Sequence, residues 1–245
     1  QIMGRNLWNG LSADVQGAFE AARKEEGEKI LPVIIHSDAA DVQALPWETL
    51  FHPIYGFIGK NPDFTLTRRS SAQEATGGLD QGPLRVLLFT SLPANVDPER
   101  SRLKVEEEQA EVQAALLPWI AQGLVTLEMP DDGSFSTLQN LLKEFQPHVL
   151  FLSGHGNFHH MPHANEAYGE FFFEDEAGDS VGVKEDEIAD ALRGTGVQAV
   201  ILSACESGKA ASDELSNGLT RKISAAGIPH VVGMREAIYD VAGIQ

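Results

Sequence analysis

Residues 149–156 read VLFLSGHG, and residues 199–208 read AVILSACESG. Each stretch is a short apolar run that ends in small and polar residues, a pattern typical of a buried strand leading into a loop. The first loop contains His155 and the second contains Cys205, which is the only cysteine among the 245 residues. The fold and the chemistry of the protein are both predicted from these two stretches.

Strands and helices alternate on either side of these stretches. Strands are predicted at residues 85–90, 125–128, 149–152, 199–202 and 229–232. Helices are predicted between them at residues 105–117, 135–145, 185–192 and 213–225. The alternation is interrupted at residues 169–183, where three phenylalanines precede a turn-forming stretch with Gly178, so a hairpin is expected there. This order predicts an α/β protein with a mainly parallel sheet flanked by helices.

The first third of the chain has a separate pattern. It predicts a helix over residues 12–25, a strand over 30–35, a short helix opened by Pro46 and a strand over 64–68. Residues 70–83 are rich in Ser, Thr, Gly and Gln and have almost no large apolar side chain, as in a linker. The sequence therefore predicts two parts, over residues 1–75 and 83–245.

The charge balance limits the partners of the protein. There are 36 acidic and 18 basic side chains, the formal net charge is -18, and no run of Lys and Arg offers a face to phosphates. Direct nucleic-acid binding is therefore not expected. No apolar run is long enough to span a bilayer and the first residues lack the pattern of a secretory signal, so a cytoplasmic protein is predicted. A single cysteine excludes intramolecular disulfides and a multi-cysteine zinc site.

His155 and Cys205 are the candidate catalytic residues. In open α/β sheets ligands sit beyond the carboxyl ends of the strands, and both residues follow such an end. The glycines beside His155 let a substrate backbone approach and permit unusual backbone angles. A helix amino terminus and an imidazolium would increase the thiolate fraction of Cys205. Taken alone, Cys205 is also typical of a small core side chain, and the Gly-His-Gly triplet of a plain turn.

Together, the SGHG and LSACESG motifs resemble those of the CHAT domain, a family of caspase- and separase-like peptidases. LPWE at residues 45–48 resembles a motif of the family's amino-terminal half, and FED at 173–175 resembles its hairpin. The resemblance covers nearly the whole chain. It implies a caspase-like (caspase-haemoglobinase) fold, with a pseudo-caspase-like half over residues 1–75 and a peptidase half over 83–245.

By position in these motifs, His155 matches the family's catalytic histidine and Cys205 its nucleophile. The amides of Gly156 and Cys205 would form the oxyanion hole, and a dyad is expected because no third member is evident. The resemblance implies a cysteine endopeptidase that cleaves a protein substrate without a cofactor. It also implies control by a helical-repeat or ligand-sensor domain in a bacterial defence or signalling system. CHAT domains usually continue beyond the helix begun at Arg235, so the peptidase half is expected to be truncated at its carboxyl end.

The sequence has two alternative interpretations. A catalytically inactive caspase-like interaction module would have the same fold, but both His155 and Cys205 are present in their motifs. A nucleotide-binding α/β protein is disfavoured because residues 91–94 read SLPA, where a phosphate-binding glycine motif would be expected.

The remaining polar clusters are assigned no catalytic role. Irregular spacing around Pro162 favours a polar loop over a metal site for the histidines at 155, 159, 160 and 163. The acidic runs 106–108 and 131–132 are interpreted as solvated faces or helix-start charges.

Two tryptophans and three acidic residues complete the candidates. Trp47 and Trp119 lie in predicted helices and are interpreted as packing residues. Asp38, Asp97 and Glu206 are considered as acids that could line a pocket for a basic substrate side chain.

Overall fold

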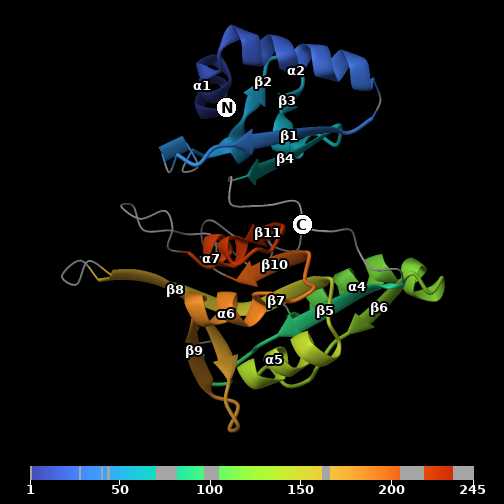
Figure 1. The fold of residues 1–245 in the computed structure, drawn as a ribbon, viewed down its shortest axis with the longest axis vertical. Helices are drawn as coiled ribbons and strands as arrows, with labels where there is room; N and C mark the ends of the chain where they lie inside the picture. Colours follow the sequence, from blue (N-terminus) through green and yellow to red (C-terminus); the bar gives the residue numbers. More distant parts are fainter. Residues whose placement is uncertain are drawn as a thin grey trace. The chain divides into compact units, whose positions relative to one another are not determined.

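The computed structural model describes residues 2–27, 29–39, 41–42, 45–69, 82–96, 105–161, 166–204 and 218–233. The chain divides into two compact units, Gln1–Ser71 (unit 1) and Ala72–Gln245 (unit 2), and each is described by itself (Figure 1). That unit 1 is a pseudo-caspase-like half stays a prediction.

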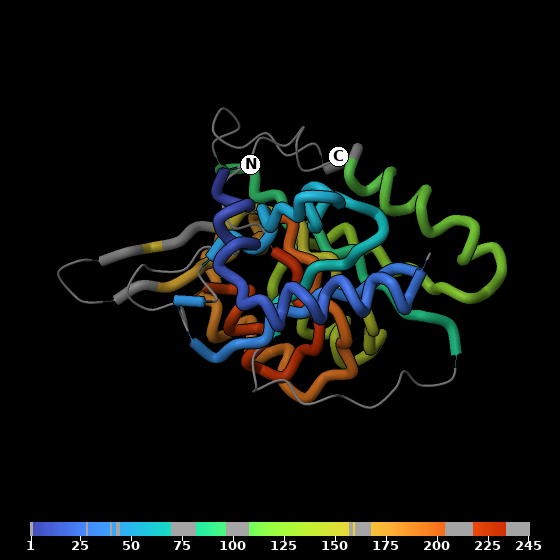
Figure 2. Tube along the Cα trace, turned by 90° about the horizontal axis from the view of Figure 1, so that it is seen from above, coloured from blue at the N-terminus to red at the C-terminus, as the bar shows by residue number. Residues whose placement is uncertain are grey.

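Unit 1 consists of two helices and a small parallel sheet. Its elements are α1 (Ile2–Gly10), α2 (Ala13–Glu26), β1 (Leu31–His36), η1 (Trp47–Thr49), β2 (Phe51–His52), β3 (Gly56–Phe57), η2 (Ile58–Lys60) and β4 (Phe64–Arg69). α1, β2 and β3 were not predicted from the sequence, whereas α2 begins after Ser12, whose hydroxyl accepts the N–H of Val15 as an N-cap. Figure 2 shows α1 and α2 as successive blue coils. β1 pairs in parallel with β4, and β2 pairs antiparallel with β3.

An aromatic cluster forms the core of unit 1. The Trp8 ring lies 4.4 Å from the His52 ring, and Phe19 stacks on Phe64 at 5.5 Å. His52 is buried, and its Nδ1 accepts backbone N–H groups while its Nε2 lies 2.8 Å from Glu20 Oε1. The prediction that Trp47 packs in the core is confirmed, because it is 6% exposed.

Unit 2 is built on a parallel sheet in the order β11-β10-β7-β5-β6, to which β8 and β9 are added beside β7. Its strands are β5 (Leu84–Thr90), β6 (Val125–Glu128), β7 (Val149–Met161), β8 (Glu166–Glu174), β9 (Ser180–Lys184), β10 (Ala199–Ala204) and β11 (His230–Gly233). Its helices are α4 (Val105–Ala121), α5 (Phe135–Glu144), α6 (Glu185–Leu192) and α7 (Leu219–Ala225). The predicted α/β class, the mainly parallel sheet and the hairpin of β8 and β9 are confirmed.

The main core of unit 2 lies on one face of this sheet. Register pairs align its apolar side chains in rows, such as Phe89, Leu152 and Leu202 on β5, β7 and β10. Side chains from α5, α6, α7 and the β8–β9 hairpin complete this core, among them Leu138, Ile188, Ile223 and Phe171. Because side chains alternate along a strand, Val86 and Leu88 are buried on the opposite face.

α4, green in Figure 2, lies on that opposite face, because its Gln109 donates a hydrogen bond from Nε2 to Thr90 Oγ1 on β5. The prediction that Trp119 is a packing residue is wrong. It lies near the end of α4 and is 51% exposed. Within the part of the chain that the structure describes, no helix is both long and apolar enough to cross a bilayer.

Candidate active site

His155 lies where β7 exchanges its neighbours. Up to Gly154, β7 pairs in parallel with β10, and its pairing with β5 ends one residue earlier, at Ser153. From His155 onward it pairs antiparallel with β8, so His155 lies opposite Phe172. The strand is longer than predicted, since it continues through the polar histidine stretch to Met161. His155 is only 8% exposed, and its backbone is paired with β8 rather than lying in a free loop.

Gly154 is required by packing rather than by backbone angle. A Cβ at Gly154 would lie 2.5 Å from Phe171 Cζ and 2.9 Å from the Ser91 carbonyl oxygen. Both distances are shorter than real Cβ contacts, so a side chain here would displace the Phe171 ring or the backbone of residue 91. The expected reasons, substrate approach and unusual angles, do not apply at Gly154, because it is an extended strand residue closed in by the core.

Cys205 itself lies outside the described residues, but β10 is described up to the residue before it. Ala204 is the register partner of Gly154, and Ser203 is the partner of Ser153. Neighbouring strands lie about 4.8 Å apart. The residues that precede the two candidates are therefore side by side, one on each strand.

Hydroxyl groups form the last row of the sheet before the candidates. Thr90, Ser153 and Ser203 are register partners on β5, β7 and β10. The Ser153 hydroxyl, on a residue that is 1% exposed, donates a 2.6 Å hydrogen bond to Glu108 Oε2 of α4. Of the two interpretations of the run 106–108, Glu108 fits that of a helix-start charge, because it lies in the first turn of α4 and is half-buried. On the α4 face of the sheet, a polar row thus replaces the apolar rows just before the two candidates.

The loop after β5 is fixed by the β8–β9 hairpin. The N–H of Leu92 donates to Glu174 Oε1 at 2.7 Å, and the N–H of Ala94 donates to the carbonyl of Gly178 at 2.8 Å. The hairpin turn is closed by Asp175, whose Oδ1 accepts the N–H groups of residues 177 and 179. The turn is therefore a docked structural element, in agreement with its interpretation as a hairpin tip.

The histidine stretch is strand rather than loop in its described part. His159 Nε2 lies 2.8 Å from Glu170 Oε2, and its ring stacks on Tyr168 at 4.8 Å. Both contacts cross from β7 to β8, so His159 has a structural environment of its own. His163 lies outside the described residues. Within the described ranges there is no group of three or more His, Cys, Asp or Glu residues that could hold a metal ion.

The other predicted residues are not brought together. Gly156 lies on β7 opposite Phe171. Asp38 is an exposed residue of unit 1, after β1. Asp97 and Glu206 lie outside the described residues, so their part in a specificity pocket stays a prediction.

Sequence reasoning missed a buried carboxylate beside the β7–β8 ribbon. Glu185, the first residue of α6, is 1% exposed, and its Oε2 accepts the N–H of Gly169 on β8 at 2.6 Å. Burial raises the pKa of Glu185 above its ordinary value, although N–H groups and Lys222 nearby favour the charged form. At a helix start a glutamate is commonly solvated, so only the three-dimensional contact identifies this one.

Comparison with protein families agrees with the motifs. The family model described as CHAT domain matches residues 1–245, the whole chain. No curated protein matches it.

Proposed function

Because the chain belongs to the CHAT domain family, which is caspase-like, we propose that it is a cysteine endopeptidase with Cys205 as nucleophile and His155 as acid/base. The observation that carries the proposal is the register of β7 and β10. Gly154 and Ala204 are partners, and each is followed directly by one of the two candidates. A thiol and an imidazole that directly follow two register partners on neighbouring strands fit the spacing that such a dyad needs.

The proposed mechanism assigns each group one task. His155 takes the proton of Cys205, and the thiolate forms a bond to the scissile carbonyl carbon. Backbone N–H groups, proposed to be those of Gly156 and Cys205, stabilise the oxyanion that develops. The imidazolium then protonates the leaving amine, and water attacks the thioester with His155 as general base, which restores the thiol. No metal or cofactor takes part in this scheme.

The burial of His155 supports this assignment. At 8% exposure the ring is largely shielded, so an ion pair between thiolate and imidazolium would be weakly screened. The backbone of His155 is held by pairing with β8, and the Gly154 beside it is closely packed. Such support is what a catalytic side chain needs to keep its orientation.

Regulation is proposed from the family alone. A helical-repeat or ligand-sensor domain, in a bacterial defence or signalling system, would switch the activity on, and the substrate would be a protein. Isolated protein and protein with such a partner should then differ in the rate at which Cys205 reacts.

The test is alkylation of the purified protein with a peptide-like electrophile across pH, followed by mass spectrometry of the Cys205 peptide. An activated dyad predicts fast labelling at neutral pH that slows roughly a hundredfold in His155→Ala. His159→Ala is the matched control, because it removes a histidine of the same strand that already pairs with Glu170. Labelling that follows an ordinary thiol near pH 8.5 and ignores His155→Ala would instead support an inactive interaction module.

A further inference from the structure

The amino end of α4 is bound to the last row of the sheet by two side-chain hydrogen bonds. Glu108 Oε2 accepts the Ser153 hydroxyl on β7 at 2.6 Å, and Gln109 Nε2 donates to Thr90 Oγ1 on β5 at 3.1 Å. Ser153 and Thr90 are register partners on neighbouring strands. Two consecutive helix residues thus contact two neighbouring strands, and these contacts fix the position of Glu108 over β7.

His155 lies on the same face of β7 as Ser153. Side chains alternate along a strand, so residues 153 and 155 point to the same side, which is the side of α4. The pairing with β8 gives the same result. Phe172, the register partner of His155, lies between Phe171 and Phe173, which point into the core on the other face. Two independent relations therefore assign His155 and Glu108 to one side of β7.

The hydrogen bond to Ser153 keeps the Glu108 carboxylate one strand repeat from His155. Residues two apart on a strand are separated by about 7 Å. This separation is shorter than the Debye length of about 8 Å at physiological salt, and partly buried charges are screened less than exposed ones. Glu108 is half-buried, and Ser153 and His155 are 1% and 8% exposed. A negative charge at this position favours the imidazolium form of His155.

Other charged side chains of the β7–β9 ribbon on this face are engaged with partners of their own. Glu170 Oε2 lies 2.8 Å from His159 Nε2, and Glu174 Oε1 accepts the N–H of Leu92 at 2.7 Å. The Lys184 ammonium lies over the Tyr168 ring, 4.7 Å from its centre. Glu108 differs from these carboxylates because its contact is with β7 itself, two residues before His155.

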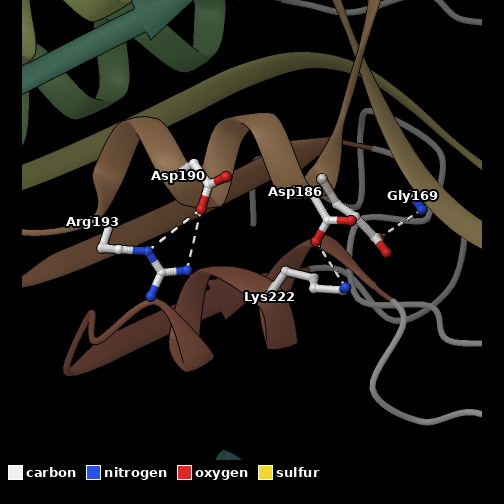
Figure 3. A network of polar contacts seen from close by, with 6 residues as sticks. Gly169, Asp186, Asp190, Arg193 and Lys222 are labelled. Atoms are coloured by element: carbon white, nitrogen blue, oxygen red, sulfur yellow. Dashed lines mark hydrogen bonds and ion pairs between the residues drawn. The ribbon is translucent and has the colours of Figure 1, made fainter.

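The buried carboxylate of Glu185 lies on the other face of the ribbon. A Cβ at Gly169 would meet Glu185 Oε2 at 2.6 Å, and residue 169 shares its side of β8 with the core residue Phe171. Figure 3 shows this contact at the Gly169 amide, with the ion pair of Lys222 and Asp186 beside it. The ribbon backbone therefore separates Glu185 from the face of His155.

We propose that Glu108 is a positioning residue of the Cys205–His155 dyad, and that its carboxylate, held by Ser153, stabilises the imidazolium that forms when His155 takes the proton of Cys205. The inference rests on the function proposed above. In this step the proton moves from the thiol sulfur to an imidazole nitrogen, and the carboxylate neither gains nor loses a proton. Glu108 forms no bond to the substrate and acts through His155.

The test is an NMR titration of the His155 ring in the Cys205→Ala background, which removes the coupled thiol. Glu108→Gln keeps an oxygen that can accept the Ser153 hydroxyl and removes only the charge. The pH at which His155 is half protonated should fall by roughly one unit. Glu111→Gln is the matched control, because Glu111 is an exposed carboxylate about one turn further along α4. It should move this midpoint by less than about 0.2 unit.

Alkylation of Cys205 in the otherwise wild-type chain is the second readout. It should become roughly tenfold slower at neutral pH in Glu108→Gln, and it should change by less than about twofold in Glu111→Gln. A purely structural role of Glu108 in docking α4 would lower the stability without moving the His155 midpoint. A folded Glu108→Gln protein with the wild-type midpoint would therefore overturn the proposal, and so would a larger shift in Glu170→Gln or Glu174→Gln.

Ser153→Ala covers a failure of Glu108→Gln to fold. It keeps the charge of Glu108 and removes the hydroxyl that holds it, so the His155 midpoint should fall by a smaller amount. An unchanged midpoint in Ser153→Ala would overturn the role given to Ser153, and with it the proposal. If Cys205 of wild type reacts like an ordinary thiol and ignores His155→Ala, the proposed function fails and takes the positioning role with it. If wild type is activated and Glu108→Gln is equally so, only the inference on Glu108 fails.

Discussion

The parallel pair β1–β4 of unit 1 ends on His36 and Arg69, and the parallel pair β7–β10 of unit 2 ends on Gly154 and Ala204. His36 is the last residue of the first pair and His155 directly follows the second, but His36 is exposed whereas His155 is 8% exposed. A strand end with a histidine is therefore not enough to make a site. In unit 2, His155 is also paired with β8, and the neighbouring Gly154 packs against the Phe171 ring of the core.

The strands before these ends explain the difference. β1 and β4 alternate between covered and exposed residues, as strands with one protected face do. In β5, four consecutive residues, 86–89, are buried, which is typical of a central parallel strand covered on both faces. Unit 2 thus has a rigid interior directly behind its strand ends. It can hold side chains in place, whereas unit 1 has exposed side chains at the same position.

The largest expected difference is in activity. Cys205→Ala and His155→Ala should each lower kcat/KM on a cleaved peptide by roughly three orders of magnitude or more, because each removes one half of the reacting pair. His36→Ala, at the end of the parallel pair of unit 1, should leave kcat/KM unchanged. Full activity in Cys205→Ala, or a loss in His36→Ala, would contradict the contrast between the two strand ends.

The next difference is in packing behind the ends. Gly154→Ala should lower the free energy of unfolding by about 3 kcal/mol, because its Cβ meets the Phe171 ring and the Ser91 carbonyl. Gly17→Ala in α2 of unit 1 meets nothing within 4 Å and should raise it by about 0.5 kcal/mol through helix propensity. Urea unfolding of both variants measures the contrast. Equal and small effects would show that the Phe171 ring has room to move.

A smaller effect is expected in the aromatic core of unit 1. His52→Ala removes the contact with Glu20 and the acceptor of the Ile54 and Tyr55 N–H groups, so it should cost about 2 kcal/mol. The exposed His36→Ala should stay within about 0.5 kcal/mol. Thermal unfolding followed by tryptophan fluorescence, which reports on buried Trp8 and Trp47, is the measurement. A negligible effect of His52→Ala would mean that water replaces its bonds.

The smallest expected effects are the pH dependences of stability from two carboxylates of unit 2, whose pKa values are shifted in opposite directions. The Thr137 hydroxyl and the Ser134 N–H lower the pKa of Asp132 from its usual 3.8. The stability from Asp132 is present above that pH and lost as the pH falls through the lowered value. The pKa of Glu185 is raised above its usual 4.5 by burial, so wild type loses stability as the pH rises from 4.5 through the raised value.

Melting temperatures across pH separate these two cases. Asp132→Asn should destabilise at neutral pH, with the difference fading below about pH 4. The melting temperature of Glu185→Gln relative to that of wild type should be lowest in acid and should rise with pH. Parallel curves for either variant and wild type would show that the carboxylate does not change its proton affinity on folding.

The regular part of unit 2 was predictable because its signals are local. Short apolar runs such as 199–202 and amphipathic stretches such as 185–192 depend on neighbouring residues only. The hairpin was predictable from three phenylalanines and a turn. In unit 1, α1 gave no such signal, and η1 was found only because Pro46 opens it.

The candidate site was predictable in its residues and less so in its reasons. Motifs identified His155 and Cys205, but that their strands are neighbours follows from the order β11-β10-β7-β5-β6, which no local pattern contains. A glycine is needed at 154 because the Phe171 ring of β8 packs against it, and Glu108 accepts a hydrogen bond from the Ser153 hydroxyl on β7. Both contacts join residues that are far apart in the sequence. Charged residues near a helix start look alike in sequence whether they are solvated or, as Glu185 is, enclosed by two other elements.

β7 belongs to two assemblies, the parallel sheet before His155 and the antiparallel ribbon from His155 onward. His155 is the residue at which the two assemblies meet, so any change in the angle between the sheet and the ribbon is taken up by the backbone at His155.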